Sequence, residues 1–259
     1  MFRQIDDLLR GRRTEPTMLA GGNVNLPLSQ FIGAAVALGA IYAFFMGWFA
    51  VLNRIPVQYV QLLAAMVKLP LLFLLTLLVT FPSLYVFNAL VGCRLGFVAT
   101  LKLLIGAIVV NLAVAASFGT ILGFFTLSTT SYEFMVLLNV ALLGLAGFVG
   151  LGFLLRVLRR VALWQAVRLT NPQGFADVDK GGPTPAGQPA ESPDSLLGPA
   201  NAVFRVWVVI FGLVGAQMAW LLRPFIGSPA LPFEWFRPRS GNFFLSVLGA
   251  IQKLADLRH

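Results

Sequence analysis

Histidine and cysteine are almost absent from this chain of 259 residues. The single histidine is His259 and the single cysteine is Cys93. Because these two residue types supply the usual ligands of haem, iron–sulfur clusters and structural zinc, the sequence offers no ligand set for such groups. One cysteine also excludes a disulfide bond within the chain. We therefore expect no cofactor and no metal site.

Charged side chains are scarce as well. They make up 11% of the residues, whereas 58% are apolar and the mean hydropathy is +0.83. Soluble domains contain about 25% charged and about 45–50% apolar residues. The composition therefore predicts an all-α integral membrane protein, with about five transmembrane helices plus interfacial amphipathic helices.

Five apolar stretches come close to the roughly 20 residues that a helix needs to cross about 30 Å of hydrocarbon. They are residues 31–51, 69–91, 103–125, 134–155 and 206–222. Two shorter stretches are different. Residues 57–67 predict either a helix lying in the interface or an extension of the second span. Residues 241–257 have the periodicity of an amphipathic surface helix.

These stretches divide the chain into five parts. We expect a cytoplasmic N-terminal segment (1–28), a four-span membrane region (29–167) with an interfacial helix near 57–67, a flexible cytoplasmic linker (168–200), a fifth span (201–222) and an interfacial basic-aromatic C-terminal segment (223–259). The linker is rich in proline, glycine, serine and acidic residues. It contains too little apolar surface to offset the entropy lost on ordering.

Lysine and arginine predict the orientation, because they accumulate on cytoplasmic flanks. With the N-terminus inside, twelve of them lie on the cytoplasmic side and seven on the outer side. This distribution favours a cytoplasmic N-terminus and an outer C-terminus, most simply in a bacterial inner membrane. Tryptophans are then expected at the outer interface (Trp48, Trp220, Trp235) and at the inner interface (Trp164, Trp207).

Polar side chains within the spans are few and uncharged. They are Thr76, Thr80, Asn88, Asn111, Asn139 and Gln217. Small residues also recur at every fourth position in two spans, in the stripes Ala35, Gly39, Ala43, Gly47 and Ala107, Asn111, Ala115, Gly119, Gly123. Both features are typical of helices that pack closely, with amides and hydroxyls bonding across the contact. A polar path for a solute, lined by the three asparagines, is the less favoured alternative.

Pro82 lies inside the second span. A proline has no backbone N–H and clashes with the carbonyl four residues earlier, so we expect this helix to bend near Leu78. Thr76 and Thr80 are candidates to satisfy the freed carbonyl.

The residues needed for catalysis are missing from the predicted spans. Intramembrane enzymes generally use a histidine-activated hydroxyl, paired carboxylates or a metal, and the only histidine here is the last residue. Asp177 and Asp179 are better explained as part of a solvated acidic loop. We therefore expect no enzyme, no catalytic residues and no nucleic-acid partner.

The C-terminal segment alternates aromatic and basic side chains. Arg223, Trp235, Arg237 and Arg239 belong to it, together with several prolines that prevent a continuous helix. Such a composition suits the headgroup layer, so we interpret the segment as an interfacial anchor. A specific lipid or partner site formed by these four residues is the alternative, because one guanidinium group can donate two parallel hydrogen bonds to phosphate oxygens.

Two stretches resemble a known group of proteins. Residues 217–229 (QMAWLLRPFIGSP), with the later Phe236-Arg237 and Gly241-Asn242, resemble the ending of an uncharacterised family of bacterial multi-span membrane proteins. Residues 68–92 are similar to the middle of the same group. The resemblance implies no activity and assigns no functional residue. More loosely, the five spans resemble the Yip1-type membrane-organising proteins.

Two functions follow from these observations. The first is a non-enzymatic scaffold or accessory subunit of a membrane assembly, with the lipid bilayer and other membrane protein subunits, or a second copy, as partners. The second is a passive channel or carrier for a small solute or lipid, suggested by the polar side chains and the proline in the second span.

Overall fold

The computed structural model describes residues 28–53, 59–90, 97–170, 198–223, 225–226, 233–236 and 241–256. All regular structure in these ranges is helical. The helices are α3 (Leu28–Leu52), α4 (Tyr59–Leu90), α5 (Phe97–Ser128), α6 (Tyr132–Thr170), α9 (Gly198–Leu222) and α10 (Phe243–Asp256). The expected N-terminal segment, up to residue 27, lies outside the described residues.

Among the described residues, four helices are long and apolar enough to cross a membrane. They comprise Leu28–Leu52, Tyr59–Val86, Phe97–Ser128 and Tyr132–Val157, and a shorter apolar stretch, Val206–Leu222, lies within α9. The prediction of an all-α, multi-pass membrane protein is thus confirmed. α9 has 25 residues in total, enough for a span of about 37 Å at 1.5 Å per residue.

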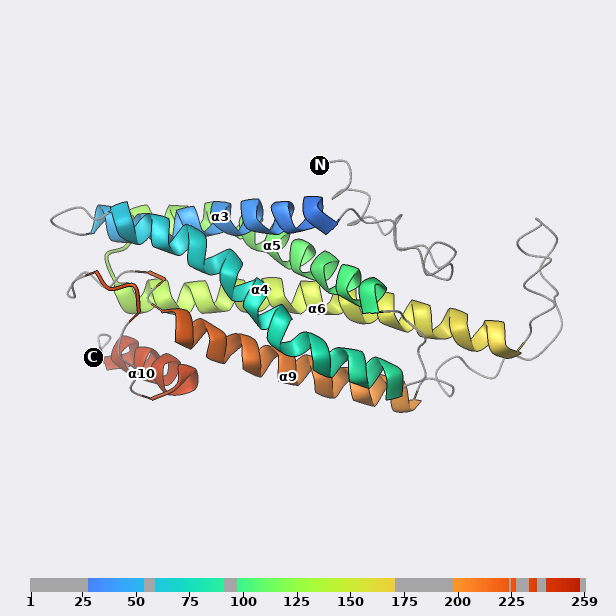
Figure 1. Ribbon diagram of the computed structural model, residues 1–259. Helices are drawn as coiled ribbons and strands as arrows, with labels where there is room; N and C mark the ends of the chain where they lie inside the picture. Colours follow the sequence, from blue (N-terminus) through green and yellow to red (C-terminus); the bar gives the residue numbers. More distant parts are fainter. Residues whose placement is uncertain are drawn as a thin grey trace.

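The five long helices lie side by side, and each runs in the opposite direction to the one before it (Figure 1). α3 packs on α4 and α5, α5 packs on α6, and α4 packs on α9. The buried apolar side chains of the described residues form two clusters along the bundle. One cluster includes Phe31, Leu84 and Trp207, and the other includes Tyr42, Leu69 and Met135.

Of the described helices, α6 is the longest, with 39 residues. At 1.5 Å per residue it measures about 58 Å, nearly twice the hydrocarbon thickness of a bilayer. Its C-terminal turns extend well beyond the neighbouring helices (Figure 1). Helix α6 ends at Thr170 and α9 begins at Gly198, so the segment expected as a linker over 168–200 is helical at both edges, and residues 171–197 lie outside the described residues.

α4 crosses the bundle obliquely, beginning beside α3 and ending beside α9 (Figure 1). It contains two prolines, Pro70 and Pro82. Each removes one backbone hydrogen bond to the carbonyl four residues earlier, which favours bending of the helix. Only Pro82 was expected to act in this way. α4 also begins at Tyr59 without interruption, so residues 59–67 extend the second span and do not form a separate interfacial helix.

The stripe of small residues on α3 faces α4. Ala35, Gly39, Ala43 and Gly47 are all buried. A Cβ atom built on Gly39 would lie 3.2 Å from Cγ of Pro70, and one built on Gly47 would lie 3.1 Å from Cα of Leu62. The expectation that this stripe packs against another helix is therefore confirmed.

The stripe on α5 contacts two different helices. Asn111 lies against Gly150 of α6, where a Cβ would be 3.2 Å from Cα of Asn111. Gly119 and Gly123 lie against the ring of Phe45 on α3, at 2.7 and 2.9 Å from the corresponding Cβ positions. A spacing of four residues advances 40° beyond one helical turn, so a long stripe winds from one neighbour to the next.

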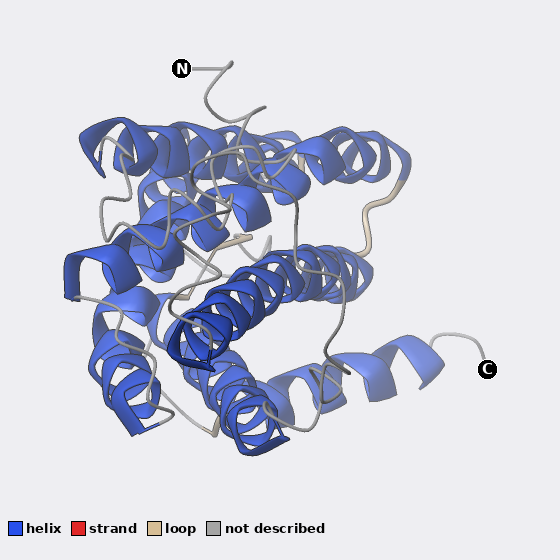
Figure 2. Ribbon diagram, turned by 90° about the vertical axis from the view of Figure 1, so that its right-hand side faces the viewer, coloured by secondary structure: helices blue, strands red, loops and turns tan. Residues whose placement is uncertain are grey.

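α10 is a short helix of 14 residues that contacts α6 and α9. It projects from the side of the bundle toward the C-terminus (Figure 2). Asn242 caps it, because its Oδ1 accepts a hydrogen bond from the backbone N–H of Leu245 at 2.9 Å. Phe244, Leu248 and Ile251 form an exposed apolar face. This face is what the sequence predicted for an amphipathic helix, and 14 residues are too few to span a bilayer.

Candidate functional site

A positively charged side chain is buried where the C-terminal segment meets α4. Lys68 is only 2% exposed. Its Nζ donates a hydrogen bond to the backbone carbonyl of Trp235 and lies 5.8 Å from the ring centroid of Trp235 and 5.0 Å from that of Phe236. A carbonyl oxygen and two aromatic faces compensate part of the cost of removing an ammonium group from water.

A second polar contact fixes the same segment to α4. Nε2 of Gln61 donates a hydrogen bond to the carbonyl oxygen of Phe225 at 2.9 Å. Gln61 and Lys68 are seven residues apart, so they lie two turns apart on one face of the helix. Ile226 is buried in the same apolar cluster as Tyr42 and Leu69. We call residues 225–226 and 233–236 the C-terminal strap.

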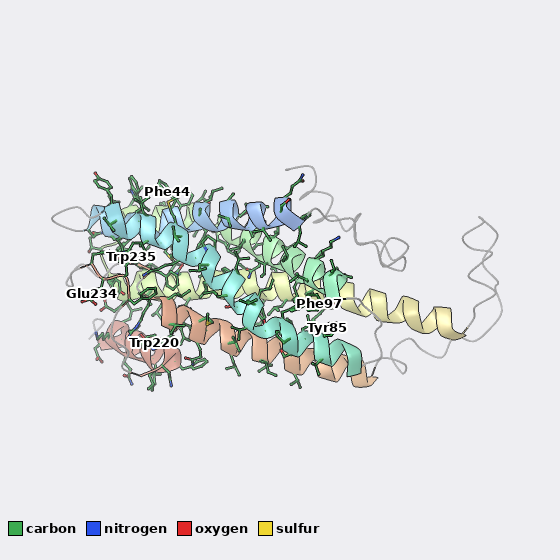
Figure 3. All side chains as sticks on the ribbon, in the orientation of Figure 1. Phe44, Tyr85, Phe97, Trp220, Glu234 and Trp235 are labelled. Carbon is green, nitrogen blue, oxygen red and sulfur yellow. The ribbon has the colours of Figure 1, made fainter. Side chains whose placement is uncertain are left out.

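The C-terminal strap packs against the helices of the bundle. Sequence reasoning expected an anchor lying on lipid, whereas Phe225, Ile226 and the Trp235 carbonyl contact the helices. The Trp235 side chain is exposed. Figure 3 shows Trp235 and Glu234 at one end of the bundle, with Trp220 also at that end and with Tyr85 and Phe97 toward the other. The segment is thus held by protein contacts while it presents aromatic rings outward.

The three arginines of the expected C-terminal site are Arg223, Arg237 and Arg239, and the structure describes only the first of them. The guanidinium carbon of Arg223 lies 3.5 Å from the ring centroid of Trp220, a close cation–π contact. Arg237 and Arg239 lie outside the described residues. The structure therefore separates Arg223, which stacks on α9, from Trp235, which covers Lys68.

One of the intramembrane amides bridges two helices. The hydroxyl of Tyr42 on α3 donates a hydrogen bond to Oδ1 of Asn139 on α6 at 2.7 Å, and both side chains are buried. Asn111 is also buried, but its Oδ1 has no hydrogen-bond partner within the described part of the chain. Asn88 lies in α4, and its side chain is outside the described residues.

The two threonines of α4 do not bond across to a neighbouring helix. Oγ1 of Thr80 donates to the carbonyl of Thr76 at 2.7 Å, within the same helix. Pro82 frees the backbone carbonyl of Leu78, which Thr76 or Thr80 was expected to bond. The Thr80 hydroxyl instead donates its shortest hydrogen bond to the carbonyl of Thr76. Oγ1 of Thr76 is buried with no hydrogen-bond partner among the described side chains and backbone. Gln217 of α9 is exposed on the surface of the bundle.

These amides do not lie at one level of the bundle. Asn111 contacts Gly150 of α6, and Asn139 precedes Gly150 by eleven residues in the same helix. Eleven residues correspond to about 16 Å along the helix axis. Asn139 is also engaged by Tyr42. The described asparagines thus serve separate helix contacts.

Sequence reasoning placed Trp207 at the inner membrane interface, but its side chain is buried inside the protein. Trp207 is fully buried, and its indole Nε1 donates to Oγ of Ser83 at 3.2 Å. Oγ of Ser83 in turn donates to the carbonyl of Thr80 at 2.7 Å. This chain joins α9 to the turn of α4 that contains Pro82. The sequence signal for this contact was Ser83, directly after Pro82. A serine hydroxyl in a helix can donate to a nearby backbone carbonyl, which leaves its oxygen available to accept a hydrogen bond from another helix.

No family model, curated protein or solved structure matches the chain. Within the described ranges, no group of three or more histidine, cysteine, aspartate or glutamate side chains is placed to hold a metal ion.

Proposed function

We propose that this protein is a non-enzymatic membrane scaffold or accessory subunit, which binds a transmembrane helix of another membrane protein on the outer face of α6. The observation that carries the proposal is the exposure of this helix. Only 28% of the most apolar window of α6 is buried, compared with 50–67% in the other three long spans.

The exposed face of α6 combines small and large apolar residues. A Cβ built on Gly144 or Gly147 would meet no atom within 4 Å, so both glycines open away from the bundle. Leu145 lies between the two glycines and Phe148 follows the second one. Both side chains project outward, and Phe148 is 76% exposed. Helices associate in membranes through small residues that allow close approach of the backbones. An outward glycine pair beside large side chains provides such a surface.

The location and orientation belong to the same proposal. We place the protein in a bacterial inner membrane with the N-terminus in the cytoplasm and the C-terminus outside. The distribution of lysine and arginine along the sequence supports this orientation. The resemblance of the C-terminal stretch QMAWLLRPFIGSP to bacterial multi-span proteins supports the bacterial membrane.

A passive channel or carrier is the alternative function, and we favour it less. Its support was the set of asparagines, which in the described part of the bundle lie at different levels and against different helices. An enzyme has the least support, because the sequence has a single histidine at its last position.

Purification from native membranes in mild detergent tests the proposal. The wild-type chain should retain a second membrane protein in fixed stoichiometry, and Gly144→Leu should lose it because the added side chain blocks close approach. Gly33→Leu is the matched control, since Gly33 of α3 is also open. Each variant is compared with wild type by its thermal midpoint in detergent.

Retention of the partner by Gly144→Leu, with the thermal midpoint unchanged, would contradict the proposed surface. A complex containing only copies of this chain would replace the accessory role with self-association. An assembled protein that has no partner and conducts a solute in liposomes would favour the channel.

A further inference from the structure

α9 carries a shallow groove of about 460 Å³ near its C-terminal end. The residues that line it are Leu213, Val214, Gln217, Met218, Trp220 and Leu221. Most of this lining is apolar, and the amide of Gln217 is exposed within it. The groove is therefore an open, mostly apolar surface that contains one strong hydrogen-bonding group.

A cation lies beside the groove. Arg223 follows the last residue of α9, and its guanidinium carbon is 3.5 Å from the ring centroid of Trp220, one of the lining residues. Stacking on the indole fixes the guanidinium at the end of the groove before any ligand binds. Trp220 lies at the same end of the bundle as Glu234 and Trp235 (Figure 3). This end is where the chain leaves the apolar part of α9, as expected for headgroup depth.

We propose that this groove binds one anionic phospholipid, with an acyl chain along Leu213 and Val214 and the phosphate at Arg223. The order of chemistry along α9 matches that of a phospholipid. Leu213 and Val214 lie deepest, the Gln217 amide follows, and the cation comes last, beside Trp220. Gln217 precedes Arg223 by six residues, or about 9 Å along the axis, so the amide lies deeper than the phosphate, on the side of the ester carbonyls.

Charge favours a lipid over a protein helix as the occupant. A transmembrane helix would fill an apolar groove but brings no phosphate to a guanidinium at its end. Arginine recognises phosphate oxygens through paired, charge-assisted hydrogen bonds. An anionic phospholipid supplies the apolar chain and the phosphate together, and it is already present in the bilayer.

Native mass spectrometry of the detergent-purified chain tests the lipid site. The protein is titrated with dioleoylphosphatidylglycerol and, separately, with dioleoylphosphatidylcholine. We expect one tightly bound phosphatidylglycerol per chain and weaker binding of phosphatidylcholine. Arg223→Gln should lower the affinity for phosphatidylglycerol about fivefold, which corresponds to about 1 kcal/mol for one interfacial cation. Arg223→Lys, which keeps the charge, should retain the preference.

Two further variants separate the groove from its charge. Lys253→Gln removes an exposed cation of α10 and should leave lipid binding unchanged. Leu213→Trp fills the groove without touching Arg223 and should weaken binding of both lipids. Equal phosphatidylglycerol affinity in wild type and Arg223→Gln, or unchanged binding in Leu213→Trp, would overturn the proposal. A protein segment cross-linked to the groove in place of lipid would also overturn it.

Discussion

Replacing Lys68 by methionine should release the C-terminal strap from α4. Methionine keeps an unbranched stem of similar length but removes the ammonium group that bonds the Trp235 carbonyl and faces the Trp235 and Phe236 rings. The change therefore removes the charge and preserves most of the packing. Because the Lys68 ammonium group contacts the strap, we expect the effect to be local to it.

The magnitude follows from two opposing contributions. A hydrogen bond to a charged group contributes about 1.5–3 kcal/mol, and a cation–π contact adds about 0.5–2 kcal/mol. Burying the ammonium costs several kcal/mol before these contacts form, so the net contribution is smaller than their sum. We expect the strap to lose about 1–2 kcal/mol, or roughly 5- to 30-fold in its local opening equilibrium.

Hydrogen–deuterium exchange in detergent measures this opening directly. Peptides covering residues 225–236 should exchange roughly 5- to 30-fold faster in Lys68→Met than in wild type, as that free-energy loss implies. Gln61→Leu removes one neutral hydrogen bond, worth about 0.5–1.5 kcal/mol, and should have a smaller effect. Lys253→Met, at an exposed position of α10, is the control.

Unchanged or slower exchange in Lys68→Met would refute the reasoning. It would mean that desolvation of the ammonium cancels its contacts, and that the Gln61 hydrogen bond and the apolar packing of Ile226 hold the strap. Equal acceleration in Lys253→Met would show that the effect follows net charge and has no connection with the buried contact.

Three further predictions concern two helix contacts in the bundle and the orientation of the chain in the membrane. Gly39→Leu should destabilise the bundle by about 1–3 kcal/mol through overpacking against Pro70, which would lower its thermal midpoint in detergent. Gly33→Leu, at an open position, should leave the midpoint unchanged, and equal midpoints for the two variants would refute the close contact. Asn139→Leu leaves the Tyr42 hydroxyl without its acceptor and should cost about 1–3 kcal/mol of stability. Adding Tyr42→Phe should recover part of that stability, whereas additive losses in the double variant would show that the bond does not couple the helices. Protease added to inside-out vesicles should cut between residues 171 and 197, as the composition of this stretch and the proposed orientation predict, and cutting only in right-side-out vesicles would invert the topology.

Local sequence pattern was sufficient to predict most of the helices. Long apolar stretches define spans because every backbone group must be bonded within the bilayer, which leaves the helix as the structure for such a stretch. The four-residue spacing in α3 likewise predicted a packed face, and Gly39 and Gly47 lie against α4. Pro70 was missed although it follows the same rule as Pro82.

Contacts between segments far apart in the sequence could not be predicted from local sequence patterns. Gln61 and Phe225 are 164 residues apart, and Lys68 and Trp235 are 167 residues apart. No periodicity within either segment records such a pairing. The available signal was the occurrence of two polar residues seven positions apart at the start of an apolar helix, which share a face and need partners. Trp207 was assigned to the interface because tryptophan is common there, whereas the bundle buries it against Ser83.

Photo-cross-linking from the exposed face of α6 tests the proposed function most directly. A benzoylphenylalanine placed at Phe148 is irradiated in native membranes, and the same group at Phe124 of α5, which is 64% exposed, is the control. We predict a discrete protein cross-link from position 148 and lipid adducts from position 124. Lipid adducts alone at both positions would contradict a docking role for α6, and with it the scaffold or subunit function.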